Sequence, residues 1–249
     1  MKNKLISINN LKKVYYTQKD DIEALSNIGF DIFENEFISI VGPSGCGKST
    51  ILSILAGLEK KTDGDVVFYK NLKIGYMLQD DCLFFWRSIL DNCLIGLEVN
   101  DELTEENINY VISLLKTYGL YEFKDKYPSS LSGGMRQRVA LIRTLAMKPD
   151  ILLLDEPLSA LDSQSRLAIG DDIYKIIKNE GKTAIMVTHD IAEAISMSDK
   201  IVVLSKRPAI IKNIYNINLD NKSSPINNRS CNNFSSYYEE IWRDLDVQL

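Results

Sequence analysis

Short apolar runs alternate with amphipathic stretches along most of the chain, which is the pattern of an α/β protein. One predicted helix, Ser49–Leu58, ends near Gly57. β-Branched and aromatic residues between polar turns predict strands in the first eighty residues. These strands are Ile6–Tyr16, Ala24–Ile32, Phe37–Val41, Val66–Tyr69 and Ile74–Leu78.

The apolar spacing becomes helical from Ile89 to Ala146. One helix is predicted after Thr104, a suitable N-cap, with Glu105 and Glu106 in its first turn. Two sets of residues recur at helical intervals, namely Ile108, Val111, Ile112 and Leu115, and then Met135, Val139, Ile142 and Ala146. We interpret this stretch as a helical subdomain inserted into an α/β core.

The α/β pattern resumes after this insertion. Buried strands are predicted at Ile151–Asp155, Thr183–Thr188 and Lys200–Leu204, with a helix at Ser163–Lys178. Asn and Ser dominate Asn221–Ser236 and favour a loose linker, and Tyr237–Leu245 predicts a short closing helix. We therefore expect one domain over residues 1–249. Its parts are an α/β core with a β-subdomain (1–88 and 148–220), the helical subdomain (89–147) and the C-terminal linker and helix (221–249).

Composition narrows the possible partners. The net charge is −5, and Lys and Arg are scattered, so nucleic acid is not an expected ligand. No apolar run is long enough to cross a bilayer, which assigns any membrane role to partner proteins. The four cysteines have no metal-ligand spacing and indicate reduced thiols in a cytosolic protein.

A glycine-rich loop carries the first chemical signal. Residues 42–49 fit G-x-x-x-x-G-K-[ST] at every fixed position, between a predicted strand and a predicted helix. Backbone amides of such a loop and the start of the following helix bind phosphate, while Lys48 supplies a cation and Ser49 a ligand for Mg²⁺. The predicted nucleotide-binding residues here are Gly42, Pro43, Ser44, Gly45, Cys46, Gly47, Lys48, Ser49 and Thr50.

Two carboxylates end a later apolar run. Asp155 is a candidate Mg²⁺ ligand, as at the same position of other phosphate-loop ATPases, and Glu156 a candidate general base. Between this run and the phosphate loop stands Leu131-Ser132-Gly133-Gly134, followed by Gln137-Arg138. With these three motifs in this order, the chain resembles the ATPase subunits of ABC transporters over nearly its whole length. The resemblance implies a phosphate-loop NTPase (RecA-like) core, an N-terminal antiparallel β-subdomain and an ABC-specific helical subdomain.

The resemblance also assigns roles to other residues. It implies a head-to-tail homodimer that binds ATP and Mg²⁺, in which Ser132, Gly133 and Gly134 of one copy cap the γ-phosphate bound by the other. His189 matches the family's switch histidine, Gln79 the glutamine that senses Mg²⁺ and touches the membrane partner, and Asp162 the loop that crosses the dimer interface. Tyr15 matches the aromatic that stacks on adenine, although the neighbouring Tyr16 remains an alternative.

Leu83–Asn92 resembles a stretch of one importer subgroup, which handles nitrate, sulfonates such as taurine, bicarbonate and thiamine precursors. The aromatic residues of this stretch either line a groove for the membrane partner or belong to the core. The resemblance implies an importer with transmembrane permease subunits and, indirectly, an extracytoplasmic solute-binding protein, the chain lying on the cytoplasmic face of the membrane. Alternatives are a soluble ABC-type ATPase without transport and a nucleotide-binding scaffold without turnover.

The chain also departs from the family pattern in two places. The stretch from Leu58 to Gln79 is shorter than usual, so we expect reduced strand pairing there. The chain ends before the extra regulatory domain of sugar-type importers, so no C-terminal inhibition site is expected.

Overall fold

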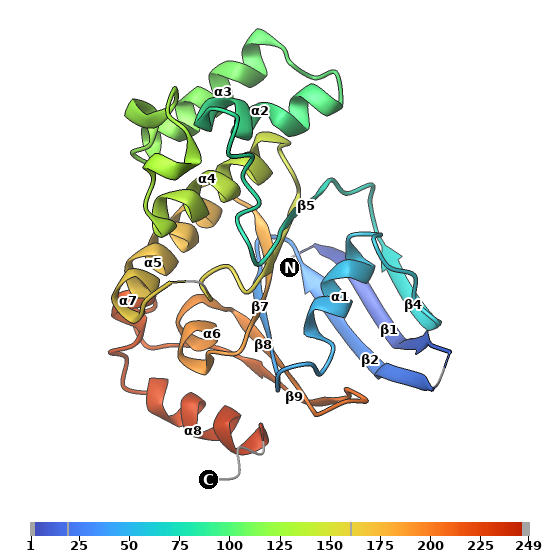
Figure 1. The fold of residues 1–249 in the computed structure, drawn as a ribbon. Coiled ribbons are helices and arrows are strands. Elements are labelled where there is room, and N and C mark those ends of the chain that lie inside the picture. The colour runs from blue at the N-terminus through green and yellow to red at the C-terminus, as the bar shows by residue number, and fades with distance from the viewer. Residues whose placement is uncertain (1–2, 19, 160, 246–249) are drawn as a thin grey trace.

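The computed structural model describes residues 3–18, 20–159 and 161–245 (Figure 1). Its strands are β1 (Lys4–Tyr16), β2 (Asp21–Phe33), β3 (Phe37–Val41), β4 (Asp63–Phe68), β5 (Ile74–Met77), β6 (Ile151–Asp155), β7 (Thr183–Thr188), β8 (Lys200–Leu204) and β9 (Ile211–Asn216). Its α-helices are α1 (Lys48–Leu55), α2 (Ile89–Val99), α3 (Glu105–Thr117), α4 (Gly133–Ala146), α5 (Ser163–Asn179), α6 (Ile191–Met197), α7 (Pro225–Asn228) and α8 (Phe234–Asp244). Two 3₁₀ turns, Tyr121–Phe123 and Pro128–Ser130, lie between α3 and α4.

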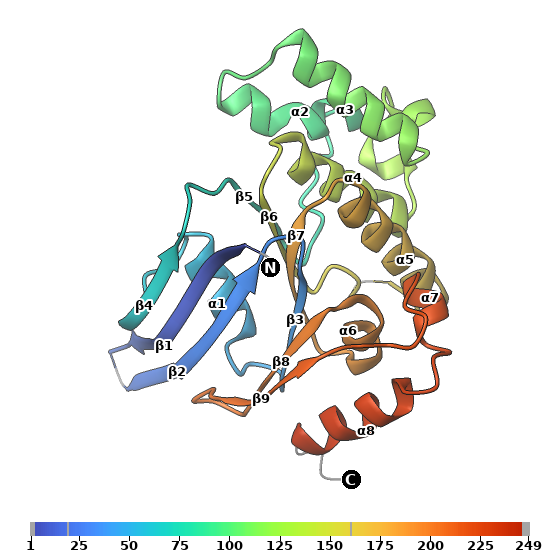
Figure 2. The same ribbon diagram turned by 180° about the vertical axis from the view of Figure 1, so that it is seen from behind.

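The strands form two sheets. A central sheet has the order β5-β6-β7-β3-β8-β9, in which the first five strands are parallel and β9 is antiparallel to β8. A second, antiparallel sheet has the order β2-β1-β4 (Figure 2). The carboxyl ends of β3, β6 and β7 are adjacent in the central sheet. Loops that follow such strand ends form the usual ligand site of a parallel sheet.

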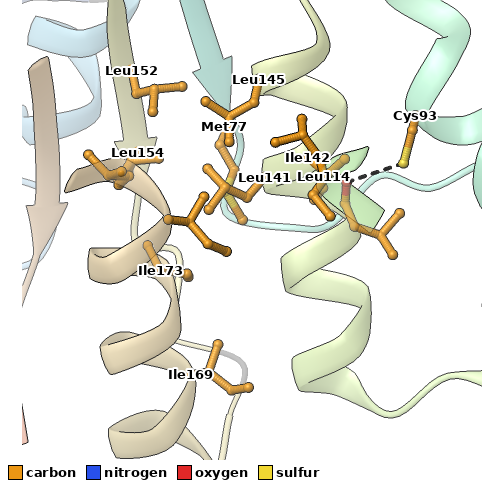
Figure 3. Close-up of a cluster of buried hydrophobic side chains, with 14 of the residues drawn as sticks. Met77, Cys93, Leu114, Leu141, Ile142, Leu145, Leu152, Leu154, Ile169 and Ile173 are labelled. Atoms are coloured by element: carbon orange, nitrogen blue, oxygen red, sulfur yellow. Dashed lines mark hydrogen bonds between the residues drawn. The ribbon is translucent and has the colours of Figure 1, made fainter. Parts of the chain in front are cut away.

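Both faces of the central sheet are covered, as a parallel sheet requires. Alternate residues of β6 show this division, because successive side chains of a strand point to opposite faces. Ile151 and Leu153 pack with α1 and the antiparallel sheet, so these elements form one core. Leu152 and Leu154 pack against α4 and α5 in a second core (Figure 3). A third core joins β8 to α6 and α8.

The region predicted to be helical contains α2, α3 and α4, drawn from green to olive in Figure 1. Polar caps fix where these helices begin: the hydroxyls of Ser88, Thr104 and Ser132 each accept a backbone N–H from the first turn. The apolar faces of the three helices belong to the same core as Leu152 and Leu154. The helical region is therefore packed onto the sheet and is not a separate body.

The C-terminal segment differs from its prediction. Asn221–Ser236 is not a loose linker, because it contains α7 and the first turn of α8, which begins three residues before the predicted Tyr237. Asn228 is fully buried, and its amide donates to the carbonyl oxygen of Ser196 on α6 at 2.7 Å. The prediction of a loose linker was therefore wrong, because composition carries no information about tertiary hydrogen bonds of this kind. The sequence also missed α6 and β9. None of the described helices is both long and apolar enough to span a bilayer.

Candidate nucleotide-binding site

The loop between β3 and α1 has the shape of an anion cradle. Gly45 and Gly47 adopt left-handed conformations with φ of 71° and 116°. A Cβ atom at Gly47 would lie 2.8 Å from Cδ2 of Leu25, so only glycine fits there without rearrangement. The Lys48 ammonium donates to the carbonyl oxygens of Gly42 and Pro43 at 3.0 and 3.1 Å. The cation therefore folds back over the loop, where a phosphate can take over its hydrogen bonds.

Cys46 lies in the same loop but faces inward. Cys46 is 1% exposed and belongs to the core that contains α1, and burial raises the pKa of its thiol. Its backbone N–H donates to the carbonyl oxygen of Pro43 at 3.2 Å. The Cys46 side chain therefore faces away from any nucleotide in the cradle.

Asp155, at the end of β6, joins the loop from the neighbouring strand. Its Oδ1 accepts from the hydroxyl of Ser49 at 2.9 Å, and its Oδ2 accepts from the hydroxyl of Tyr76 at 3.1 Å. Burial, together with the Asp155 charge, raises the pKa of Tyr76 to about 12. In the described residues no three acidic, His or Cys side chains gather as a metal cluster. A hydroxyl and one carboxylate nevertheless fit Mg²⁺, which completes its shell with phosphate oxygens and water.

Glu156 and His189 complete this side of the site. Glu156 has a φ of 45°, an uncommon value for a residue with a side chain, and its N–H donates to the carbonyl oxygen of Val187 on β7. Its Oε2 lies 3.2 Å from Nδ1 of His189. The side chain of His189 is 56% exposed. One surface pocket is lined by Ser44, Gly45, Gly47, Lys48, Ser49, Thr50 and Glu156.

Tyr15 lies beside the same loop. Its hydroxyl is 3.4 Å from the hydroxyl of Thr50, and the Lys13 ammonium is 4.6 Å from the centre of its ring. Lys13 is itself buried and paired with Glu59 at 2.7 Å. Tyr16 is 72% exposed.

Gln79 lies near Glu156 without joining Ser49 and Asp155, and Asp162 has its contacts within α5. The amide of Gln79 donates to the hydroxyl of Ser159 at 3.4 Å, and this hydroxyl donates to the carbonyl oxygen of Glu156 at 2.9 Å. Asp162 caps α5 by accepting from the N–H groups of Gln164 and Ser165. Hydrogen bonding by the Ser165 side chain, and then by these N–H groups, lowers the pKa of Asp162. Ala160, between Ser159 and Asp162, lies outside the described residues.

Ser132, Gly133 and Gly134 form a separate helix start. Ser132 caps α4, and a Cβ atom at Gly134 would lie 2.6 Å from Cδ1 of Ile169 on α5. The pocket beside this start is lined by Asp80, Asp81, Gly133, Arg136, Gln137 and Leu161. It shares no residue with the pocket at the phosphate loop. Within one chain, the fold therefore does not bring Ser132 into the cradle.

Comparison with known proteins agrees with this geometry. The profile of the ABC transporter family matches residues 25–159, more than half of the chain. The chain belongs to the ABC transporter ATPase family. It is 44% identical over 248 residues to YtlC, an ABC transporter ATP-binding protein of Bacillus subtilis, covering 97% of this chain and 95% of YtlC. It is 36% identical to SsuB, the aliphatic sulfonates import ATP-binding protein of Bacillus anthracis, covering 88% and 90%.

A solved structure extends the likeness to three dimensions. The ATP-binding cassette MJ0796, in a dimeric post-hydrolysis state bound to ADP and Pi, superposes with a TM-score of 0.73 at 32% identity. The match covers 86% of this chain and 99% of that chain. The fold is thus that of an ABC ATPase cassette, and the chain is an ATP-hydrolysing, ATP-binding subunit of this type.

The aromatic residues of Leu83–Asn92 lie mostly at the surface of this ABC ATPase. Phe85 and Trp86 are 73% and 60% exposed, with their rings edge to face at 4.6 Å. Asn92 is fully buried, and its side chain hydrogen-bonds to the backbone of Phe84 and donates to carbonyl oxygens of Arg87 and Ser88. Asn92 therefore fixes the turn that presents Phe85 and Trp86, and these two residues are not core aromatics.

Two contributors to the site were missed by the sequence reasoning. The hydroxyl of Tyr76 donates to Asp155. Glu193 on α6 accepts from the hydroxyl of Thr188, the residue directly before His189, at 2.5 Å. No local motif marks either residue. A tyrosine within an apolar strand and a glutamate on a short helix are both ordinary in sequence, and only the packing of distant elements gives them partners.

Proposed function

We propose that this chain is the ATP-hydrolysing subunit of an ABC importer and works as a homodimer. The observation that carries the proposal is that Lys48, Ser49 and Thr50 line the same pocket as Glu156. Asp155 contacts Ser49 of this pocket, and His189 contacts Glu156. We also propose that residues 1–249 form one ABC ATPase domain in which 89–147 is the helical subdomain.

The reaction is transfer of the γ-phosphoryl group of ATP to water. Glu156 accepts a proton as the water oxygen bonds to the γ-phosphorus, and the bond from that phosphorus to the bridging oxygen breaks to give ADP and phosphate. His189, hydrogen-bonded to Glu156, orients the water and contacts the γ-phosphate. Lys48 and the loop amides stabilise the negative charge of the transition state.

Ser49, Asp155 and Gln79 are the residues that hold Mg²⁺ in this proposal. An ion held there would supply positive charge against the phosphate groups of ATP. Ser49 and Asp155 already contact each other, whereas Gln79 contacts Ser159 and has to turn toward the ion. Gln79 therefore links occupancy of the phosphate site to the surface loop that follows β5.

Tyr15 is the better candidate for the adenine platform. Its ring is fixed on one side by the buried Lys13 ammonium, and its hydroxyl lies against Thr50 next to the phosphate loop. A ring held in this way loses little further freedom when a base stacks on it. Tyr16 is largely exposed and follows at the end of β1.

The start of α4 favours action across a dimer. Ser132, Gly133 and Gly134 present backbone N–H groups at a helix N-terminus, which favours an anion, yet they lie apart from the phosphate pocket of their own chain. We propose that they contact the γ-phosphate bound by a second copy. Asp162, at the start of α5, lies in the loop assigned to this interface.

Transport requires partners that span the membrane. We propose that two permease subunits bind at the surface around Phe85 and Trp86, with the chain on the cytoplasmic face of the membrane and a solute-binding protein delivering the cargo outside. Exposed aromatic pairs of this kind are typical of binding surfaces. Organic sulfonates are the proposed cargo class, since the chain resembles the sulfonate importer subunit SsuB.

Phosphate release from ATP by the purified chain tests the enzymatic part. Glu156→Gln should abolish steady-state turnover while ATP binding is retained, and ATP should then double the mass of the particle in solution. Glu106→Gln, at a side chain 86% exposed on α3, is the matched control and should behave as wild type. Full turnover by Glu156→Gln, or a monomer with ATP trapped, would contradict the proposal.

Two further measurements test the transport part. Pull-down from solubilised membranes should recover a multi-spanning protein, and Phe85→Ala/Trp86→Ala should lose it while keeping ATP affinity. Uptake of a labelled alkanesulfonate should fail in cells that lack this chain. Normal uptake in such cells would exclude the proposed cargo class.

A further inference from the structure

Glu193 is the most deeply buried carboxyl beside the switch histidine. It is 5% exposed, and its Oε2 accepts from the hydroxyl of Thr188. That hydroxyl in turn accepts the N–H of Asp190 at 3.1 Å, and Oδ1 of Asp190 accepts the N–H of Glu193 at 3.0 Å. These three residues close a ring of hydrogen bonds at the end of β7, so Glu193 is tied to the residues on both sides of His189.

Two arginines from different parts of the chain face this carboxyl. Arg166 on α5 and Arg229 directly after α7 line one small cavity together with Glu193. Oε1 of Glu193, Nε of Arg166 and Nε of Arg229 are buried and have no hydrogen-bond partner among the described residues. The cavity measures about 10 Å³, close to the space that one water molecule needs. Burial raises the pKa of Glu193 to about 7, while both arginines act to lower it.

Arg166 also reaches the two loops of the catalytic side. Its guanidinium donates to the carbonyl oxygen of Leu161 at 3.2 Å and lies 3.6 Å from Oδ2 of Asp190. Arg166 thus connects the loop before Asp162 with the turn that contains His189.

Arg229 is held in place by the C-terminal segment. Pro225 and Asn228 of α7 are buried, and Asn228 donates to Ser196 of α6, the helix that carries Glu193. α7 packs on both α5 and α6 (Figure 2). The C-terminal segment therefore supplies one of the two cations that face a buried acid next to the catalytic turn.

We propose that Glu193, held between Arg166 and Arg229, positions His189 for ATP hydrolysis, which makes α7 part of the catalytic unit. The proposal rests on the proposed ATPase function. Glu193 and Arg229 are positioning residues, since neither reaches the phosphate pocket. Their loss should disturb the reacting end of ATP and leave the grip of the phosphate loop intact.

Steady-state ATP hydrolysis by the full chain tests this. Arg229→Met should lower kcat about tenfold, less than the roughly 100-fold that a 1 Å misplacement of a reacting group can cost, with KM for ATP unchanged. Arg229→Lys, which keeps the charge, should recover part of kcat. Arg243→Met is the matched control. It also removes one arginine, but the side chain of Arg243 on α8 is 74% exposed.

A second variant tests whether the pair acts together. At pH 8, above its raised pKa, Glu193 carries a negative charge. Glu193→Gln keeps an acceptor for Thr188 and removes that charge, so at this pH it should lower kcat to a similar extent. The double variant Glu193→Gln/Arg229→Met should lose little more than either single variant, because contacting residues are not additive. Losses that multiply would contradict the proposed unit.

His189 offers a readout that needs no activity. It is the only histidine of the chain, so its imidazole signals in the NMR spectrum of the tag-free protein are unambiguous. Arg229→Met and Glu193→Gln should shift these signals, and Arg243→Met should not. If Arg229→Met has the kcat and the imidazole signals of the wild type, the inference about Glu193 and Arg229 is wrong while the proposed function stands. The same holds if Arg229→Met has a lower melting temperature but an unchanged kcat. No turnover by the wild type would instead overturn the proposed function.

Discussion

Substitution of Gly134 by alanine tests whether packing against α5 requires a glycine at the start of α4. A Cβ atom at this position would lie 2.6 Å from Cδ1 and 2.8 Å from Cγ1 of Ile169, closer than van der Waals contact allows. Ile169 is 8% exposed, so its side chain has little room to move. Overpacking of this kind costs about 1–3 kcal/mol.

Alanine also has a higher helix propensity than glycine, which returns up to about 1 kcal/mol. We therefore expect the free energy of unfolding to fall by about 1–2 kcal/mol. For a chain of this size that corresponds to a melting temperature lower by about 2–8 °C. Urea unfolding monitored by circular dichroism measures the first quantity, and calorimetry the second.

Two further variants separate the clash from other effects. At the neighbouring Gly133, a Cβ atom would meet two side-chain ends, Cδ2 of Leu161 at 3.3 Å and Nη2 of Arg136 at 3.9 Å, so Gly133→Ala should be neutral or slightly stabilising. Ile169→Val removes the nearest atom, so Gly134→Ala/Ile169→Val should be more stable than the two single changes predict by about 0.5 kcal/mol or more. A fully stable Gly134→Ala, or strict additivity of the pair, would refute the packing argument.

The remaining predictions concern the site itself. Tyr15→Ala should weaken ATP binding about 5- to 150-fold, from about 1–3 kcal/mol of stacking, whereas Tyr16→Ala should not; equal effects in a fluorescence titration would reject the assignment. Tyr76→Phe should lower the free energy of unfolding by about 1–3 kcal/mol, because it removes a hydrogen-bond donor from the buried Asp155. An unchanged free energy in a urea titration would contradict this prediction. Burial raises the pKa of Glu193 from 4.5 to about 7, so folding favours its protonated form. Its contribution to stability is complete below pH 4.5 and is lost as the pH rises through 7, so Glu193→Gln should gain about 3 kcal/mol relative to wild type across this range. Thermal unfolding at several pH values measures this, and a constant difference would contradict it.

The local parts of the site were predictable from sequence. The loop from Gly42 to Ser49 needs glycines where the backbone is left-handed and a helix directly after it. Both features can be recognised in a short run of consecutive residues. The caps at Thr104 and Ser132 are local for the same reason, since a side chain satisfies an N–H three residues away. The two carboxylates that end an apolar run marked Glu156, and the family resemblance assigned His189, but neither predicted their mutual contact.

Contacts between distant segments had to come from the tertiary structure. Asp155 and Tyr76 are 79 positions apart, and Ser49 and Asp155 are 106 apart. Their hydrogen bonds exist only because β5, β6 and β3 belong to one sheet. The loose linker predicted for Asn221–Ser236 was wrong because Asn228 finds its partner on α6.

The sequence by itself determined the phosphate loop and the helix starts and so predicted which residues bind a triphosphate, since periodicity, capping and glycine geometry act over a few neighbouring positions. The tertiary structure alone decided which of these residues meet, that Ser132 is kept apart from the phosphate loop of its own chain, and that Arg229 faces Glu193. The reason is that burial and pairing depend on how whole elements pack, and packing is a property of the entire chain.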